Sequence, residues 1–232
     1  MTLFSRKTLP AAISLALGTA LVPFAVQAGW YVGAGAGATS FEETGITAAD
    51  VEDIIVPAII DSADVSLSED DSDTGFKVLA GYRFNQYVAV EVQFADLGTA
   101  SLDFTGEGDI DGGEGGSIDV DIAGGADVDV DGFGINVEGS WPINESLSLI
   151  GKIGMFSWDA ESAGSIDLTV GGDTESFAVA TDDDGTDVNF GIGARYTFMK
   201  QLGVQLEWER YALESDVDLI SASVTWEFGA AK

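Results

Sequence analysis

The sequence contains no cysteine and no histidine, and only 4 of its 232 residues are proline. Without cysteine, the chain can form neither a disulfide nor a thiolate metal site. Without histidine, it lacks the side chain that titrates near neutral pH and often serves as a general base. Carboxylates could take that role, but no pair among the 40 acidic residues stands in a distinctive arrangement. The sequence therefore does not indicate an enzyme.

Basic residues are scarce, and two of the nine lie at the N-terminus. Arg6 and Lys7 precede a stretch of small apolar residues that ends in Val26-Gln27-Ala28, the pattern of a secretory signal with a small-residue cleavage site. A membrane anchor is the alternative, but the stretch is short and interrupted by proline. We predict a signal peptide over residues 1–28, cleavage between Ala28 and Gly29, and one domain over residues 29–232.

Removal of residues 1–28 leaves 7 basic and 40 acidic residues, a formal net charge of −33. Such a charge disfavours nucleic acid as a partner, because phosphates require cationic side chains. The acid is concentrated in a few segments, and eleven carboxylates lie between Glu42 and Asp73. We interpret most of these residues as a solvated surface.

The predicted mature chain also lacks an apolar run long enough for a membrane helix. Instead, apolar and polar residues alternate with a period of two, which is typical of strands with one apolar face. Each such segment has the roughly ten residues that a tilted strand needs to cross a bilayer. The eight predicted strands are Gly29–Phe41, Thr74–Phe84, Tyr87–Leu97, Val130–Trp141, Leu147–Ala160, Asp187–Phe198, Gln201–Tyr211 and Val217–Gly229.

Two further patterns favour a membrane barrel over a soluble β-sandwich, which alternates in the same way. Aromatic residues gather near both ends of the apolar faces, as in interfacial girdles; they are Trp30, Phe84, Trp141, Phe198 and Phe228 at one end and Phe41, Phe94, Phe133, Phe190 and Trp208 at the other. Short turns also alternate with long connections, as expected of periplasmic turns and outer loops. An even number of strands places both mature termini on the short-turn side.

The long connections contain signals of their own. Alternation on both sides of Gly124-Gly125, and again of Gly171-Gly172, predicts hairpins that extend the strands beyond the membrane. Thr47–Val56 is a candidate short helix, capped by Thr47 and ended by Pro57.

The order of several short motifs resembles the transmembrane domain of the OmpA family. The motifs are Gly29-Trp30-Tyr31-Val32-Gly33-Ala34, Gly81-Tyr82-Arg83-Phe84, Tyr87-Val88-Ala89-Val90-Glu91, Trp141-Pro142-Ile143-Asn144, Gly193-Ala194-Arg195-Tyr196, Gln205-Leu206-Glu207-Trp208 and Val224-Thr225-Trp226-Glu227-Phe228-Gly229. The resemblance covers nearly all the strands and none of the long loops. Longer members of the family continue into a peptidoglycan-binding domain, whereas this sequence stops at Lys232, so that role is not carried over.

The resemblance implies an all-β, eight-stranded, antiparallel up-and-down transmembrane β-barrel in the outer membrane of a Gram-negative cell. Implied partners are outer-membrane lipids and lipopolysaccharide, with the barrel-assembly machinery and periplasmic chaperones during biogenesis. The oligomeric state is left open. Outer-membrane barrels that are enzymes use a histidine, which this chain lacks.

Charged residues on the polar face of the strands predict a cluster inside the barrel, since a charge facing lipid would cost about 2–4 kcal/mol. The cluster comprises Lys77, Glu91, Glu138, Lys152, Arg195 and Gln205. The resembled family has an ion-pair cluster at corresponding positions, with opposite signs at Glu138 and Arg195. An interior this narrow is filled by side chains, so we favour a structural plug over a gate.

Asp182, Asp184 and Asp187 surround Gly185 and resemble part of a calcium loop. The segment lacks the bidentate glutamate of an EF-hand, so a solvated acidic loop is the favoured interpretation. Weak divalent binding is the alternative. We expect no cofactor, apart from loosely bound Ca²⁺ or Mg²⁺ at the acidic loops.

Taken together, these features predict a non-enzymatic barrel with acidic surface loops, which serves envelope integrity or surface recognition. The alternative is a narrow passive pore for ions or small solutes.

We predict that the long connections Glu42–Asp73, Gly98–Asp129 and Glu161–Thr186 face the outside of the cell, because they are long where the opposite turns are short. A cysteine at Ser66 should react with a membrane-impermeant maleimide on intact cells, and a cysteine in a short turn at Asn85 should not. Labelling at Asn85 without labelling at Ser66 would contradict this topology.

Overall fold

The computed structural model describes residues 28–42, 62–111, 116–213 and 215–228. These residues form one antiparallel sheet with the strands β1 (Gly29–Phe41), β2 (Ser62–Asp70), β3 (Ser72–Arg83), β4 (Val88–Asp111), β5 (Ser117–Pro142), β6 (Leu147–Val170), β7 (Asp173–Met199), β8 (Leu202–Tyr211) and β9 (Val217–Phe228). In this part of the chain, no helix has the length and hydropathy needed to span a membrane. The candidate helix Thr47–Val56 and nearly all of the predicted signal peptide lie outside the described residues.

The sheet closes on itself into a barrel of eight strands. β1 pairs with β3 on one side and with β9 on the other, and β4 pairs with β5 to complete the ring β1-β3-β4-β5-β6-β7-β8-β9. Closure gives every barrel strand a hydrogen-bonded neighbour on both sides over its barrel part. The predicted eight-stranded, up-and-down barrel is therefore confirmed. β2 is an additional strand, which pairs only with β4 beyond the barrel.

Alternation along each barrel strand separates an apolar outer face from a polar interior. On β5, for example, the outward Phe133 and Ile135 are 66% and 63% exposed, whereas the intervening inward residues are buried. Aromatic residues contact one another near both ends of this outer face, as in the pairs Trp30–Tyr82 and Phe94–Phe133. Phe41 is an exception to the predicted aromatic bands: it faces inward and is buried, because it has the inward parity of β1.

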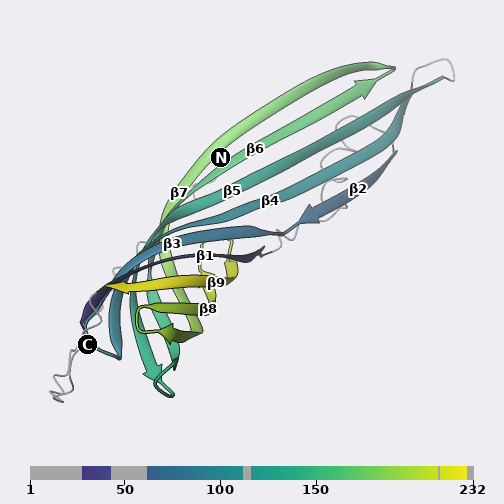
Figure 1. Ribbon diagram of the computed structural model, residues 1–232. Helices are drawn as coiled ribbons and strands as arrows, with labels where there is room; N and C mark the ends of the chain where they lie inside the picture. The colour runs from purple at the N-terminus through teal and green to yellow at the C-terminus, as the bar shows by residue number, and fades with distance from the viewer. Residues whose placement is uncertain (1–27, 43–61, 112–115, 214, 229–232) are drawn as a thin grey trace.

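β4, β5, β6 and β7 are about twice as long as the other strands, with 24 to 27 residues each. Figure 1 shows their outer halves projecting from the barrel as a sheet, with β2 along one border. The segments predicted as the long connections Gly98–Asp129 and Glu161–Thr186 are therefore mostly strand, because alternation continues through them.

The two predicted hairpin turns had different outcomes. Gly171 and Gly172 form the turn between β6 and β7, with φ values of 58° and 95° that suit glycine. The prediction of a turn at Gly124-Gly125 was wrong, since both residues lie in the middle of β5. Their lack of side chains serves packing instead: a Cβ on Gly124 would lie 2.5 Å from the Phe104 ring.

The point where the sheet leaves the barrel is marked by a bulge in β4. The register with β5 shifts between Asp96 and Thr99, and Gly98 has a φ of 81°. Asp73, at the start of β3, accepts hydrogen bonds from the backbone N–H of Thr99 at 2.9 Å and of Thr74 at 2.7 Å. These bonds hold the pKa of Asp73 below its usual value. Asp73 therefore fixes the place where β4 exchanges β3 for β2 as its neighbour.

We predict that Asp73→Asn lowers the free energy of unfolding by about 0.5–1 kcal/mol at pH 7. A carboxylate whose pKa is lower in the folded state stabilises above its unfolded-state pKa, and this contribution is lost as the pH falls through the folded-state pKa. Urea unfolding in detergent micelles at pH 7 and at acidic pH measures the difference. Asp71→Asn removes a nearby charge and serves as the control. An equal effect of both variants at both pH values would show that the hydrogen bonds to Asp73 are unimportant.

Candidate functional site

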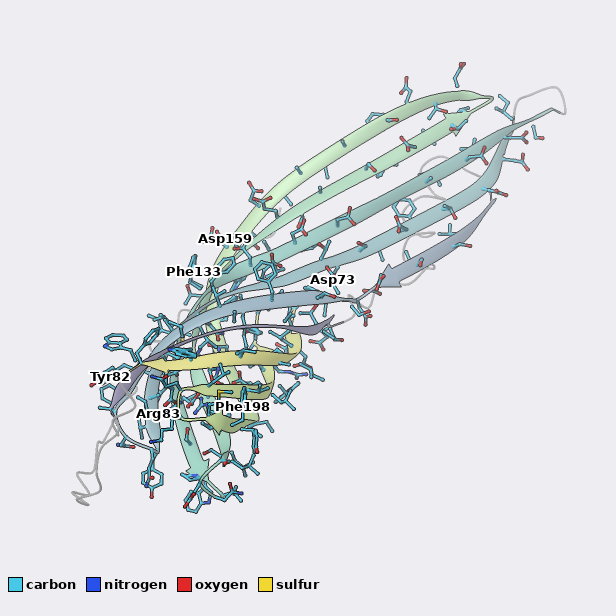
Figure 2. The ribbon with its side chains drawn as sticks, viewed as in Figure 1. Asp73, Tyr82, Arg83, Phe133, Asp159 and Phe198 are labelled. Carbon is cyan, nitrogen blue, oxygen red and sulfur yellow. The ribbon has the colours of Figure 1, made fainter. Side chains whose placement is uncertain are left out.

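The interior of the barrel holds two layers of ion pairs, and the lower layer lies towards the short turns. Arg195 on β7 donates to Glu138 on β5 at 2.5 Å and to the side-chain oxygen of Gln205 on β8 at 3.3 Å. Arg83 on β3 forms an ion pair with Glu227 on β9 and lies 3.8 Å from Glu138. Figure 2 labels Arg83 at this end of the barrel. Two cations thus balance two carboxylates in this layer.

The upper layer contains two lysines and three glutamates. Lys152 on β6 contacts Glu91 at 2.7 Å and Glu207 at 2.8 Å. Lys77 on β3 contacts Glu207 at 2.9 Å and also pairs with Glu209. Glu91 additionally accepts a hydrogen bond from the hydroxyl of Tyr31 at 2.9 Å. These partners connect strands on opposite sides of the ring, so the layer bridges the full width of the interior.

The six residues expected inside the barrel are all buried there: Lys77, Glu91, Glu138, Lys152, Arg195 and Gln205. Arg195 pairs with Glu138 and not with Glu91, which Lys152 occupies. The expected cluster omitted Glu207 and Glu209, although both alternate with the outward Leu206 and Trp208 and so share the parity of Gln205. That parity was the signal that could have identified them.

An apolar layer lies beyond the ion pairs, where the interior meets the projecting sheet. It consists of the buried residues Phe41, Ala95, Leu97, Val130, Phe156, Trp158, Tyr211, Val217 and Leu219. The rings of Phe156 and Tyr211 meet edge to face with centroids 4.7 Å apart, and the Tyr211 hydroxyl accepts a hydrogen bond from Gln93 at 3.1 Å. Because these residues come from six of the eight barrel strands, their side chains form an apolar seal across the outer mouth.

The projecting sheet has two unlike faces. Its outer face continues the lipid-facing side of the barrel but is acidic. Paired positions on β4, β5, β6 and β7 place Asp96, Asp131, Asp159 and Asp184 in one row, and the next row contains Asp129, Glu161 and Asp182. Figure 2 labels Phe133 in the apolar belt and Asp159 close above it. Burial, and then the charges of Asp159 and Asp96, raise the pKa of Asp131.

The three aspartates suggested as a divalent-cation site are not brought together. Asp182 and Asp184 lie on the outer face of β7, whereas Asp187 has the opposite parity and accepts a hydrogen bond from Trp158 at 2.8 Å. Within the described ranges, no group of three or more acidic side chains is placed to hold a metal ion. The suggestion of one site from these three residues was therefore wrong, because the segment is a strand and not a loop.

A closed eight-stranded barrel with an apolar outer belt, aromatic residues at both ends of the belt and ion pairs inside is the architecture of an outer-membrane β-barrel. The sequence bears this out: the model of the family described as outer membrane protein β-barrel domain matches residues 11–228. The chain belongs to this family and is an outer-membrane protein.

Solved structures with similar folds are also outer-membrane barrels. Ail of Yersinia pestis, in complex with the heparin analogue sucrose octasulfate, is 16% identical with a TM-score of 0.45, over 87% of this chain and 99% of Ail. The N-terminal barrel of Pseudomonas aeruginosa OprF is 12% identical with a TM-score of 0.45, over 87% and 100% of the two chains. OprG from Pseudomonas aeruginosa is 14% identical with a TM-score of 0.44, over 86% and 96%. No curated protein sequence matches the chain.

We predict that Arg195→Ala lowers the free energy of unfolding by about 3–5 kcal/mol, because the buried Glu138 then keeps only Arg83, 3.8 Å away, as an ion-pair partner. Urea unfolding of the barrel in micelles measures the loss. The double variant Arg195→Ala, Glu138→Gln should recover much of it, since the uncompensated charge is then gone. Unchanged stability of Arg195→Ala would mean that water already screens this layer.

Proposed function

We propose that this protein is a non-conducting outer-membrane barrel that anchors a recognition surface, the projecting sheet, outside the cell. The observation that carries this proposal is the combination of a filled interior with a sheet that continues far beyond the apolar belt. A barrel that served only as a pore would gain nothing from the long outer halves of four strands.

The filled interior argues against the alternative of a passive pore. A solute crossing the barrel would have to part the apolar seal around Phe156 and Tyr211 and then the two ion-pair layers. Separating a buried ion pair costs several kcal/mol, and removing apolar side chains from their packing adds to that cost. Side chains therefore fill the space that a conducting barrel would leave to water.

The orientation follows from the same features. Rows of carboxylates on the outer face of the projecting sheet cannot lie in hydrocarbon, so this sheet must be in water on one side of the membrane. We place it outside the cell, since long extensions in such barrels face outward and short turns face the periplasm. The mature termini are then periplasmic, and the acidic rows lie beside lipopolysaccharide.

No chemical reaction is assigned to the protein. The chain has no histidine, and its interior carboxylates are engaged by lysine, arginine or tyrosine. The partners that this proposal requires are outer-membrane lipids around the belt and a ligand for the projecting sheet.

We expect the purified protein to produce no steady channel openings in planar bilayers. Liposomes that contain the protein should not swell in solutions of even the smallest sugars. Heat-modifiable gel migration of protein recovered from the same liposomes verifies that folded barrels were present. Frequent, uniform openings from folded protein would overturn the proposal in favour of a pore.

A further inference from the structure

The projecting sheet ends in an unpaired edge along the outer half of β7. β8 pairs with β7 only from Asn189 onwards, so the segment Asp173–Asp187 has β6 on one side and, among the described residues, no strand on the other. Figure 1 shows this half of β7 at the border of the sheet opposite β2. An edge of this length presents a row of backbone groups that can pair with an additional strand.

The groups that point away from the sheet can be identified from the bonds near the barrel. The carbonyl of Val188 accepts from the backbone N–H of Ala212 at 3.0 Å, so Val188 directs its backbone groups away from β6. The register between β6 and β7 is unbroken up to Asp173. Alternation therefore places the free N–H and C=O groups on even-numbered residues, which are Thr174, Ser176, Ala178, Ala180, Asp182, Asp184 and Thr186.

The edge has an uncharged centre and acidic ends. The six residues Ser176–Thr181 are uncharged, and Ala178 and Val179 lie in their middle. Asp173 and Glu175 precede this window, Asp182, Asp183 and Asp184 follow it, and the segment has no basic residue. Phe177 and Val179 expose 58% and 71% of their surfaces on the inner face of the sheet.

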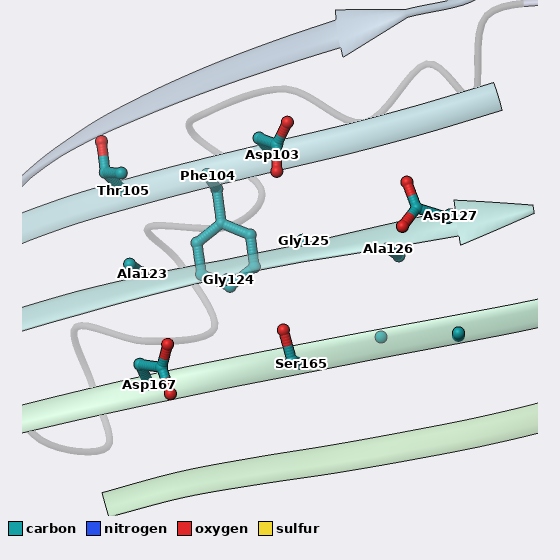
Figure 3. Close-up of a pocket in the computed structure, with 12 residues that line it drawn as sticks. Asp103, Phe104, Thr105, Ala123, Gly124, Gly125, Ala126, Asp127, Ser165 and Asp167 are labelled. Carbon is teal, nitrogen blue, oxygen red and sulfur yellow. The ribbon is translucent and has the colours of Figure 1, made fainter. Parts of the chain in front are cut away.

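An apolar hollow lies directly beside this window. Two paired rows cross the inner face, Leu102–Ala126–Gly164–Val179 and Phe104–Gly124–Ile166–Phe177. The small residues Ala126 and Gly164 in the middle of the first row leave a depression of about 400 Å³ bordered by Leu102, Phe104, Ile166 and Val179. Figure 3 shows the hollow on the opposite, outer face of the same strands, bordered by Asp103, Asp127 and Asp167, with the ring of Phe104 across Gly124.

We propose that the edge Asp173–Asp187 binds an extended segment of a partner protein as an added strand, with an apolar centre and Lys or Arg at its ends. Main-chain hydrogen bonds to the even-numbered residues would supply affinity, and a large apolar side chain reaching over Val179 into the hollow would supply specificity. The proposal rests on the proposed function only in that the sheet must face outside.

Charge decides between this occupant and a second copy of the chain. If two copies paired in antiparallel fashion about Ala178, the acidic ends would meet, with Asp173 opposite Asp183. Like charges directly opposite each other destabilise a strand pair. Cationic ends would instead be attracted to both acidic ends of the edge, more strongly at low salt.

The test uses the full barrel in detergent and a synthetic peptide with three lysines at each end and the centre Val-Thr-Val-Tyr-Val-Thr. We expect saturable binding by fluorescence anisotropy. Ala178→Pro should weaken it about tenfold or more, because proline removes one free edge N–H and keeps the added strand away without breaking the ladder to β6. Ala178→Thr keeps the N–H and should bind within about twofold of the unchanged protein, a difference below 0.5 kcal/mol.

Two further variants test the other parts of the site. Gly164→Val should weaken binding by filling the hollow; a Cβ there meets its nearest neighbours at 3.4 Å or more, so the sheet tolerates it. A peptide methylated on the alternate amides that would face β7 should not bind, and this control requires no change in the protein. Heat-modifiable migration verifies that each variant is folded.

Several outcomes would overturn the proposal. If Ala178→Pro and the methylated peptide bind as well as their unmodified counterparts, the attraction is a general effect of charge, because every carboxylate is still present. If a peptide with glutamate ends binds equally well, the partner is not cationic, and concentration-dependent dimers in sedimentation would indicate a second copy instead. If the peptide does not bind, the planar-bilayer result is unaffected, and so is the proposal of a non-conducting barrel.

Discussion

The need to pair every backbone N–H and C=O group in hydrocarbon governs this structure. A sheet in lipid can meet that need only by closing, and the pairing of β1 with β9 and of β4 with β5 achieves it. Outside the hydrocarbon, water can satisfy backbone groups, so closure is no longer required. The change is visible along β7, which has a neighbour on both sides from Asn189 onwards but, among the described residues, only β6 beside it over Asp173–Asp187. The same strand is thus part of a closed wall in one half and a free edge in the other.

Closure also determines what the interior contains. A ring of eight strands leaves an interior about as wide as its side chains, so each inward residue must contact residues from the opposite wall. Inward charges are then buried together, and each requires a partner. Glu207 shows the consequence: it bridges Lys77 from β3 and Lys152 from β6, and so ties three strands together. The apolar seal above these layers completes a continuous core from the short turns to the outer mouth.

Beyond the barrel, the same side of each strand still faces outward, but the surroundings of that side change from lipid to water. On the outward face of β5, Phe133 is the last residue of the apolar belt, and Asp131, the next outward residue away from the membrane, is acidic. Inward positions of β5 stay apolar or small, because Val128, Ala126 and Gly124 continue the line of Val130 from the core. The projecting sheet therefore carries apolar surface on its inner face into water, and its free edge lies beside that surface.

The amino-acid sequence by itself determined the barrel. Alternation with a period of two fixes which residues face lipid and which face the interior, so eight strands and the buried positions of Lys77, Glu91, Glu138, Lys152 and Arg195 followed from parity alone.

Parity on a single strand does not show which residues meet across the ring. The pairing of Arg195 with Glu138 and of Lys152 with Glu91 depends on strand register and on the curvature of the wall. Glycine pairs likewise do not distinguish a turn from a crowded strand: Gly171-Gly172 turns the chain, whereas Gly124-Gly125 makes room for Phe104. Only the tertiary structure decided that β5 runs on through Gly124-Gly125, that Asp187 faces away from Asp182 and Asp184, and that the outer half of β7 is an edge, because each of these depends on which neighbour a strand has and where that neighbour stops.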